Sequence, residues 1–161
     1  MQRFLAFLSS LFILFSIYAQ DPALKVENGT LPERYSFEME TSKGFASGIL
    51  IIKNFGDEIK GSMINEFGVA VLSFTFTPRN DKIKLQNVIG FLNKWYVKRV
   101  LKEDIKICLH SLLSIPLKKE PKNYSIQVDS NGTLSVVNLK RNISYSFSTL
   151  NIESEQYEPE E

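Results

Sequence analysis

The clearest structural signal in the chain lies in residues 70–85, which read AVLSFTFTPRNDKIKL. Apolar side chains alternate with serine and threonine over 70–77, a period of two that is typical of a β-strand with one buried face. The sequence Pro-Arg-Asn-Asp at 78–81 then predicts a turn, and the alternation resumes over 82–88. These residues therefore predict a β-hairpin, whose inward side chains are Leu72, Phe74, Phe76, Ile83 and Leu85.

Three further strand patterns precede this hairpin. Aromatic and apolar residues alternate with polar ones over 34–40, residues 44–53 contain the apolar run Ile-Leu-Ile-Ile, and residues 58–65 alternate again. Since the segments between them are short, we expect all these strands to form an antiparallel meander.

The sequence Asn-Glu-Phe-Gly at 65–68 interrupts the meander. We interpret it as a turn or bulge in which Gly68 supplies a positive φ. The alternative is that Asn65 or Glu66 lines the mouth of a ligand cavity.

From residue 91 the period of the pattern changes. Residues 91–115 contain neither glycine nor proline, and their apolar positions recur at intervals of three or four, the spacing of one helical stripe. We expect the polar sequence Lys102–Asp104 to kink or divide the helix, with Asp104 capping a second part, and Pro116 to end it. The stripe consists of Val97, Leu101, Ile105, Cys108 and Leu112.

Three more strands are predicted, over 124–129, 133–139 and 142–152. The fold is therefore expected to be mainly β (α+β): a curved antiparallel sheet of about eight strands, with one helical segment inserted after strand five. Such a sheet either closes into a barrel or forms a half-barrel with the helix on its concave side, and both architectures commonly enclose an apolar site. Residues 34–152 would form this single domain.

The two ends of the chain differ from the domain. Met1–Ala19 combines a basic start, an apolar run and a small final residue, which indicates a signal peptide cleaved after Ala19 or Gln20. Residues 20–33 form a polar leader, and residues 153–161, with five glutamates and no basic residue, are predicted to be an acidic disordered tail. We expect an exported, periplasmic protein, with secretion as the alternative.

The composition argues against several function classes. One of the 19 basic residues lies in the signal peptide and five of the 18 acidic residues lie in the tail, so the rest carries only about five net positive charges, too few for a nucleic-acid binder. Cys108 and His110 are the only residues of their kinds, which argues against a disulfide, a zinc cluster and a Ser-His-Asp or Cys-His site. Glu38 and Glu40 share one face of a predicted strand, but this face points to solvent, which argues against a pair of carboxylates that catalyses glycoside hydrolysis. We predict a monomeric protein that is not an enzyme and takes no metal or cofactor.

The helical segment also carries a row of basic residues. Lysines repeat every four residues from 94 to 106, and Trp95 and Arg99 lie beside them. We interpret the row as a solvated helix face on which lysine stems cover apolar surface. The alternative is a basic helix with aromatic residues that binds an acidic partner or an anionic membrane surface.

Four Asn-x-Ser/Thr sequences occur in the chain, a mild excess over chance. They suit either a eukaryotic secreted glycoprotein or a genome rich in Asn, Ser and Lys, and we favour the second interpretation. The asparagines are Asn28, Asn123, Asn131 and Asn142.

The layout resembles a known family. A signal peptide, a meander that contains Gly48, Lys60-Gly61 and Asn65–Gly68, and a helix before the last strands are similar to those of small exported Bacteroidetes proteins. These in turn are remotely similar to the LolA/LolB superfamily of lipoprotein carriers of the Gram-negative envelope. The resemblance covers residues 34–152 and implies a curved half-barrel whose helix-lidded cavity holds acyl chains. The chain has fewer predicted strands than the typical carrier and no lipobox cysteine.

Our leading hypothesis is a binding protein for an apolar or lipid-like ligand, acting in lipid or lipoprotein handling in the cell envelope. Burial of acyl surface would supply about 25 cal/mol per Å². Trp95 and Tyr96 are expected to form part of a lid, and the expected lining residues are Leu72, Phe74, Phe76, Tyr145 and Phe147. The same residues could instead form a packed core. The alternative function is a ligand-free interaction module that uses its basic helix against an acidic partner, an envelope protein or a membrane; a filled core with an exposed Trp95 would favour it.

Overall fold

A computed structural model describes residues 32–42 and 44–150. The predicted signal peptide over 1–19, nearly all of the predicted leader and the predicted acidic tail lie outside these described residues. Within them the chain folds into eight β-strands and one α-helix, which follows the fifth strand. The prediction of a mainly β fold with one helix at this place is confirmed.

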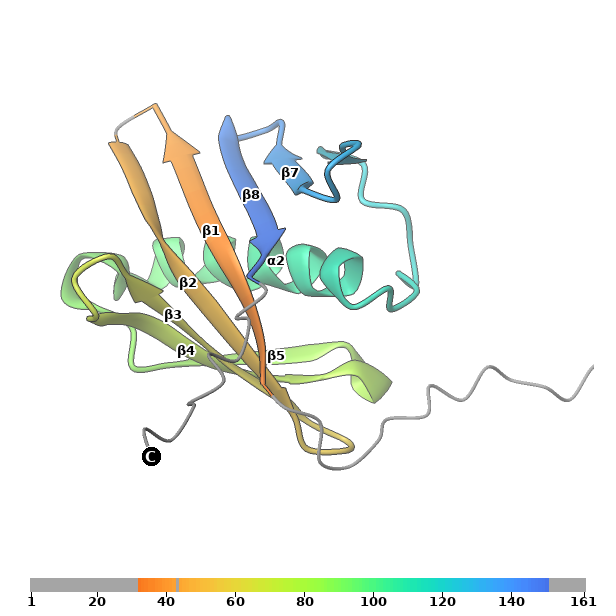
Figure 1. The fold of residues 1–161 in the computed structure, drawn as a ribbon, viewed down its shortest axis with the longest axis horizontal. Coiled ribbons are helices and arrows are strands. Elements are labelled where there is room, and N and C mark those ends of the chain that lie inside the picture. Colours follow the sequence, from red (N-terminus) through yellow and green to blue (C-terminus); the bar gives the residue numbers. More distant parts are fainter. Residues whose placement is uncertain (1–31, 43, 151–161) are drawn as a thin grey trace, which may run out of the picture.

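The strands are close to their predicted bounds. They are β1 (Glu33–Thr41), β2 (Gly44–Asn54), β3 (Ile59–Asn65), β4 (Ala70–Thr77), β5 (Lys82–Gln86), β6 (Tyr124–Val128), β7 (Leu134–Asn138) and β8 (Ile143–Thr149). The helix is α2 (Trp95–Leu112), and short 3-10 turns are η1 (Pro78–Asn80) and η2 (Gly90–Leu92). All strands belong to one antiparallel sheet in the order β5-β4-β3-β2-β1-β8-β7-β6 (Figure 1).

The sheet is curved and unclosed. β5 and β6 are its two edges, so the half-barrel is observed and the closed barrel is not. Because α2 contacts both β5 and β7, near opposite edges, the sheet bends around the helix. Close packing on this concave side depends on Gly61 of β3, where a Cβ atom would overlap the ring of Phe74 on β4.

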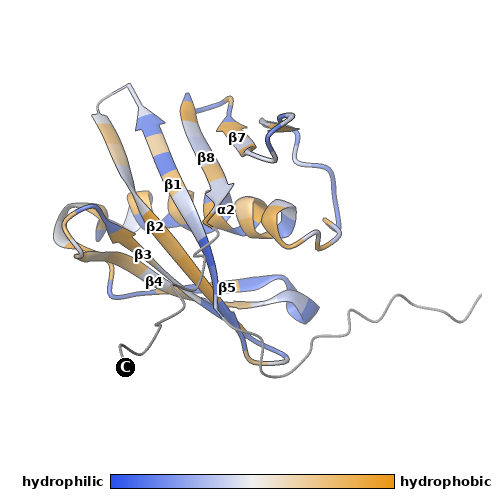
Figure 2. Cartoon of the chain, viewed as in Figure 1, coloured by the Kyte–Doolittle hydropathy of each residue, from blue (hydrophilic) through white to orange (hydrophobic). Residues whose placement is uncertain are grey.

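The core lies between the concave face of the sheet and α2, which passes behind β1, β2 and β8 in Figure 1. Figure 2 shows hydrophobic and hydrophilic segments alternating along the helix, as a stripe facing the sheet requires. No helix in the described part of the chain is long and apolar enough to cross a membrane. The buried members of the helical stripe are Leu101, Ile105 and Cys108, and the partly buried ones are Val97 and Leu112.

The helix differs from its prediction in length and continuity. It is shorter than the segment predicted over 91–115, since it begins at Trp95 and ends at Leu112. Ser114, between the helix end and Pro116, takes a positive φ of 51°. The predicted kink at Lys102–Asp104 was wrong, because α2 is unbroken there. Asp104 does not cap a helix: its side chain is fully buried and bonds to three strands, a tertiary setting that local capping preferences do not reveal.

Candidate functional site

The side chains expected to line a ligand cavity all face the concave side, where they are packed against α2. At most 4% of the surface of each is exposed. The space left beneath the helix is about 30 Å³, lined by apolar atoms from residues that include Leu72, Leu101 and Tyr145. This is room for about two water molecules and not for an acyl chain. The five packed residues are Leu72, Phe74, Phe76, Tyr145 and Phe147.

The two residues expected to form a lid lie elsewhere. Trp95 and Tyr96 occupy the first turn of α2, and their side chains are 75% and 56% exposed. Their rings contact each other edge to face, with centroids 5.9 Å apart. The structure therefore does not bring them together with the five core residues, and they form a surface of their own.

One side of this surface is a polar groove of about 420 Å³. α2 contributes one wall. The start of β6 with the residue before it, and the end of β7 with the turn that follows, contribute the other. We call it the polar groove; its lining residues are Trp95, Tyr96, Arg99, Glu103, Asn123, Tyr124, Asn138, Lys140 and Arg141.

A buried cluster around Asp104 supports the floor of the polar groove. The Asp104 carboxylate accepts hydrogen bonds from the Tyr124 hydroxyl (2.6 Å), the Asn138 amide (2.8 Å) and the Tyr145 hydroxyl (2.7 Å). Burial and the neighbouring carboxylate raise the pKa of both tyrosines well above the usual range. Because Tyr124 and Asn138 are held in this way, the groove is preorganised before anything binds.

A second groove, of about 610 Å³, lies between α2 and the start of β5. We call it the lysine groove; its lining residues are Asp81, Lys82, Ile83, Trp95, Lys98, Arg99, Lys102, Glu103 and Lys106. Trp95, Arg99 and Glu103 line both grooves, so they form the ridge between them.

Asp81 fixes the end of the lysine groove. Its carboxylate lies 2.9 Å from the Lys106 ammonium and 2.8 Å from Nε2 of His110. Partial burial alone would raise the pKa of Asp81, but the hydrogen bonds and charges of these two partners lower it below its ordinary value. Asp81 and Lys106 thus neutralise each other, and Lys106 is not a free cation of the row.

His110 is a structural residue and faces neither groove. Its side chain is buried, Nδ1 lies 3.1 Å from the carbonyl oxygen of Ile115, and the ring contacts Phe76 edge to face. The Ile115 carbonyl lies just beyond the C-terminal end of α2, where a histidine interacts favourably with the terminal carbonyls. The bond to Asp81 had no local signal in the sequence.

The two grooves are surrounded by cations that have no carboxylate partner among the described residues. Among the residues that the structure describes, three ion pairs occur, and they involve Asp81 and Glu58 as the acids. Six other lysines and arginines around the grooves therefore have no described ion-pair partner. These six cations are Lys82, Lys98, Arg99, Lys102, Lys140 and Arg141. Together with Trp95 and Tyr96 they form what we call the basic surface.

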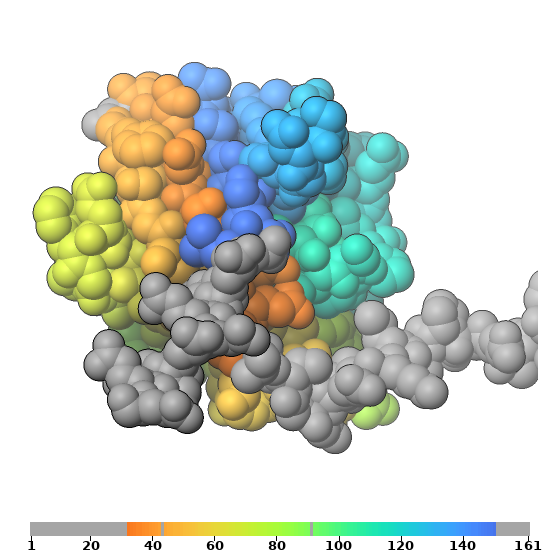
Figure 3. Space-filling view, in the orientation of Figure 1, coloured from red at the N-terminus to blue at the C-terminus, as the bar shows by residue number. Residues whose placement is uncertain are grey.

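The other candidate residues have structural roles. Asn65 accepts backbone hydrogen bonds from Phe67 and Val69 with its side-chain oxygen, and Gly68 has a φ of 76°, so the predicted turn is confirmed. Glu38 and Glu40 are exposed on the outer face of β1. Figure 3 shows the molecule from this side, with β1, β2 and β8 toward the viewer. No group of residues suited to hold a metal ion occurs in the described ranges.

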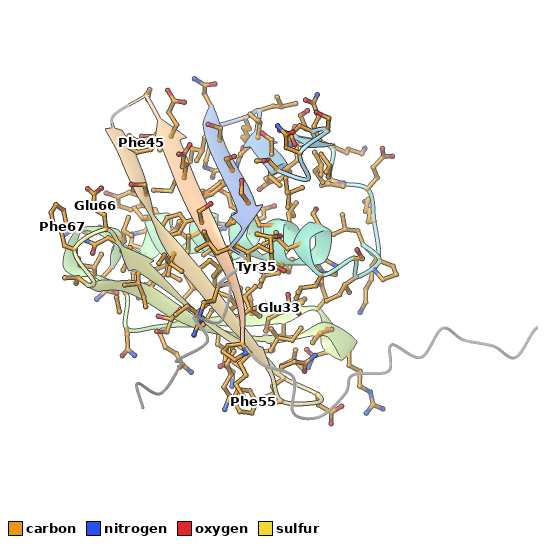
Figure 4. The ribbon with its side chains drawn as sticks, in the orientation of Figure 1. Glu33, Tyr35, Phe45, Phe55, Glu66 and Phe67 are labelled. Carbon is orange, nitrogen blue, oxygen red and sulfur yellow. The ribbon has the colours of Figure 1, made fainter. Side chains whose placement is uncertain are left out.

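Cys108 and the phenylalanines of two turns lie outside both grooves. Cys108 is buried, and burial raises the pKa of its thiol, as a structural cysteine requires. Phe55 and Phe67 lie in turns at opposite ends of the sheet (Figure 4). The ammonium groups of Lys53 and Lys60 lie 5.4 and 5.1 Å from the centre of the Phe55 ring, an arrangement that shields that ring.

Comparison with known proteins gives no relative: no family model, no curated protein and no solved structure matches the chain. The case for a function therefore comes from the geometry of the basic surface and of the core.

Proposed function

We propose that the protein is an interaction module that docks an acidic protein segment on its basic surface. The observation that supports this most is a set of cations around two grooves, next to an exposed tryptophan, that have no carboxylate partner within residues 32–42 and 44–150. The packed core supports it as well, because a space of about 30 Å³ beneath α2 offers an apolar ligand no place in this conformation.

The shape of the surface favours an extended polypeptide over a bilayer. A flat membrane meets the ridge of α2 first and leaves both flanking grooves empty, whereas an extended chain fits into a groove and brings its carboxylates close to the lysines. Glu103 on the ridge would also face the headgroups of an anionic membrane. Charge complementarity of this kind steers association and selects the partner.

The aromatic pair would supply the apolar part of the contact. Tryptophan, tyrosine and arginine are the residues that most often carry binding energy in interfaces. Trp95 and Arg99 lie side by side on the ridge, where a docked segment in either groove contacts both. The lysines at the rim contribute mainly to the rate and the salt dependence of binding.

Charge reversal tests this proposal. The double variant Lys98→Glu/Lys102→Glu is compared with Lys118→Glu/Lys119→Glu, which makes the same charge change at exposed positions that line neither groove. With a fluorescein-labelled oligoglutamate peptide as probe, we expect the first variant to bind about tenfold more weakly and the control to bind like the wild type. Equal binding by both variants, or binding to anionic phospholipid vesicles in place of the peptide, would contradict the proposal.

An apolar or lipid-like ligand is the second candidate. It is supported by the wholly apolar lining of the space beneath α2 and by the half-barrel that the resemblance to lipoprotein carriers implies. Binding would require α2 to move away from the sheet. Native mass spectrometry of protein recovered from the periplasm tests this candidate: a bound lipid supports it, and a clean apo mass with no displacement of a fluorescent acyl probe counts against it.

A further inference from the structure

The chain itself contains a segment that matches the chemistry of the basic surface. Residues 153–161 read ESEQYEPEE, with five carboxylate side chains and no basic residue. The basic surface carries six cations with no ion-pair partner among the described residues, and Glu103 is the acid on its ridge. Opposite charges of similar number are thus present in one molecule, and low salt strengthens their attraction.

The segment follows β8 in the chain, and the topology determines at which end of the sheet β8 ends. β2, β4 and β8 run in the same direction, because each is separated from the next by one antiparallel strand. The end of β8 therefore lies at the same end of the sheet as the β4–β5 turn, as Figure 1 shows. Leu150 donates its N–H to the carbonyl of Arg34 and fixes where β8 ends. Asp81 and Lys82 of that turn form one wall of the lysine groove.

The extended length of the segment is similar to the length of α2. Nine residues span up to about 30 Å when extended, and α2, with 18 residues, is about 27 Å long. Alternate residues of an extended chain lie about 6.7 Å apart. The rise from Lys98 to Lys102 along the helix is about 6 Å. Successive carboxylates on one side of the segment can therefore meet successive lysines of the groove.

We propose that residues 153–161 occupy the lysine groove and compete there with the acidic partner, an inference that rests on the proposed function. The segment then acts as a tethered competitor, whose effective concentration at the groove is in the millimolar range. An external partner binds only by displacing it. The basic surface is shielded until a partner with more carboxylates, or with a side chain that packs on Trp95, takes its place.

One test detects the contact inside the molecule, without an acidic peptide. Trp95 is the only tryptophan, so tryptophan emission reports on the basic surface alone. Replacing the five glutamates of 153–161 by glutamine should make Trp95 more accessible to the neutral quencher acrylamide, and high salt should do the same to the wild type. The control Glu38→Gln/Glu40→Gln removes carboxylates from the outer face of the sheet and should change nothing. Equal quenching of wild type and tail variant at low salt overturns the proposal.

A second measurement separates this proposal from the proposed function. The tail variant should bind the labelled oligoglutamate peptide at least about threefold more tightly than the wild type. If its affinity is unchanged while Lys98→Glu/Lys102→Glu still loses binding, the proposed function stands and the tethered competitor is overturned. If none of the chains binds the peptide but acrylamide quenching responds to the tail, the segment docks and the proposed function fails.

Discussion

Asp104, near the middle of α2, accepts a hydrogen bond of 2.7 Å from the hydroxyl of Tyr145 on β8. This bond joins the helix to the sheet on the concave side, where both residues are buried. Tyr124 and Asn138 add donors from β6 and β7, so all three C-terminal strands attach to one carboxylate. The cluster thereby determines where α2 lies, and with it the geometry of the basic surface.

The first prediction concerns this carboxylate. Asp104→Asn replaces one carboxylate oxygen by an amide donor, which faces the donors of Tyr124, Asn138 and Tyr145. Because buried donors then lose their acceptor, we expect the free energy of unfolding to fall by about 2–4 kcal/mol. Urea denaturation measures it. Glu103→Gln, at the exposed neighbouring position, serves as the control and should stay within about 0.5 kcal/mol of the wild type. Equal stability of the two variants would show that the cluster does not hold the helix.

The second prediction concerns alkaline pH. The pKa values of Tyr124 and Tyr145 are raised in the folded chain, chiefly by burial and by the Asp104 carboxylate. Stability is therefore fully present below the unfolded tyrosine pKa of about 10 and falls as the pH rises above it, because only the unfolded chain releases these protons. Urea midpoints at about pH 8 and about pH 11 should differ less for Tyr124→Phe than for the wild type. An unchanged pH dependence in that variant would refute the assignment.

The third prediction concerns acid pH. Because the pKa of Asp81 is lowered in the folded chain, its carboxylate stabilises the fold above the ordinary value of 3.8, and this contribution is lost as the pH falls through the folded value. Asp81→Asn keeps a residue that tolerates the positive φ of 56° and removes the charge. The melting temperature should fall less in the variant than in the wild type as the pH is lowered from above 3.8 to below it. Glu40→Gln, an exposed control, should melt with the wild-type pH dependence.

The fourth prediction concerns packing in the sheet. Gly61→Ala forces a methyl group into the ring of Phe74, whose side chain is 2% exposed and packed in the core. We expect a destabilisation of about 1–3 kcal/mol. At Gly90 a Cβ atom meets nothing within 4 Å, so Gly90→Ala is the matched control. If both substitutions have the same effect on the thermal midpoint, the close approach at Gly61 is not important for the fold.

Much of the fold could be predicted because its signals are local. The alternation around Phe74 and Phe76 placed a strand with a buried face, and the spacing of Leu101 and Ile105 placed the helix on one side of the sheet. Polar residues that are buried by tertiary contacts were harder to interpret. Asp104 has the sequence signature of a helix cap or a solvent-facing residue, and its three partners lie 20 to 41 residues away in the chain.

The candidate site was predictable only in part, because some of its residues are brought together from distant parts of the sequence. The basic row on the helix follows from helical periodicity, which needs no knowledge of the fold, whereas Trp95 was expected in a lid and is exposed on the first turn of α2. The grooves do not follow from periodicity, because Lys82, Lys140 and Arg141 come to the helix from two turns that are distant in the sequence. Nor could periodicity reveal whether Tyr145 lines a cavity or a packed core, since both place its side chain inward.

The most direct test of the proposed function is a titration of isotope-labelled protein with unlabelled oligoglutamate peptide, followed by two-dimensional NMR. We predict that the indole N–H signal of Trp95 and the guanidinium N–H signal of Arg99 shift progressively, that backbone shifts are confined to α2 and the turns that line the two grooves, and that all shifts disappear at high salt. Shifts spread over the outer face of β1 and β2, or no shift of Trp95 at saturating peptide, would contradict docking on the basic surface.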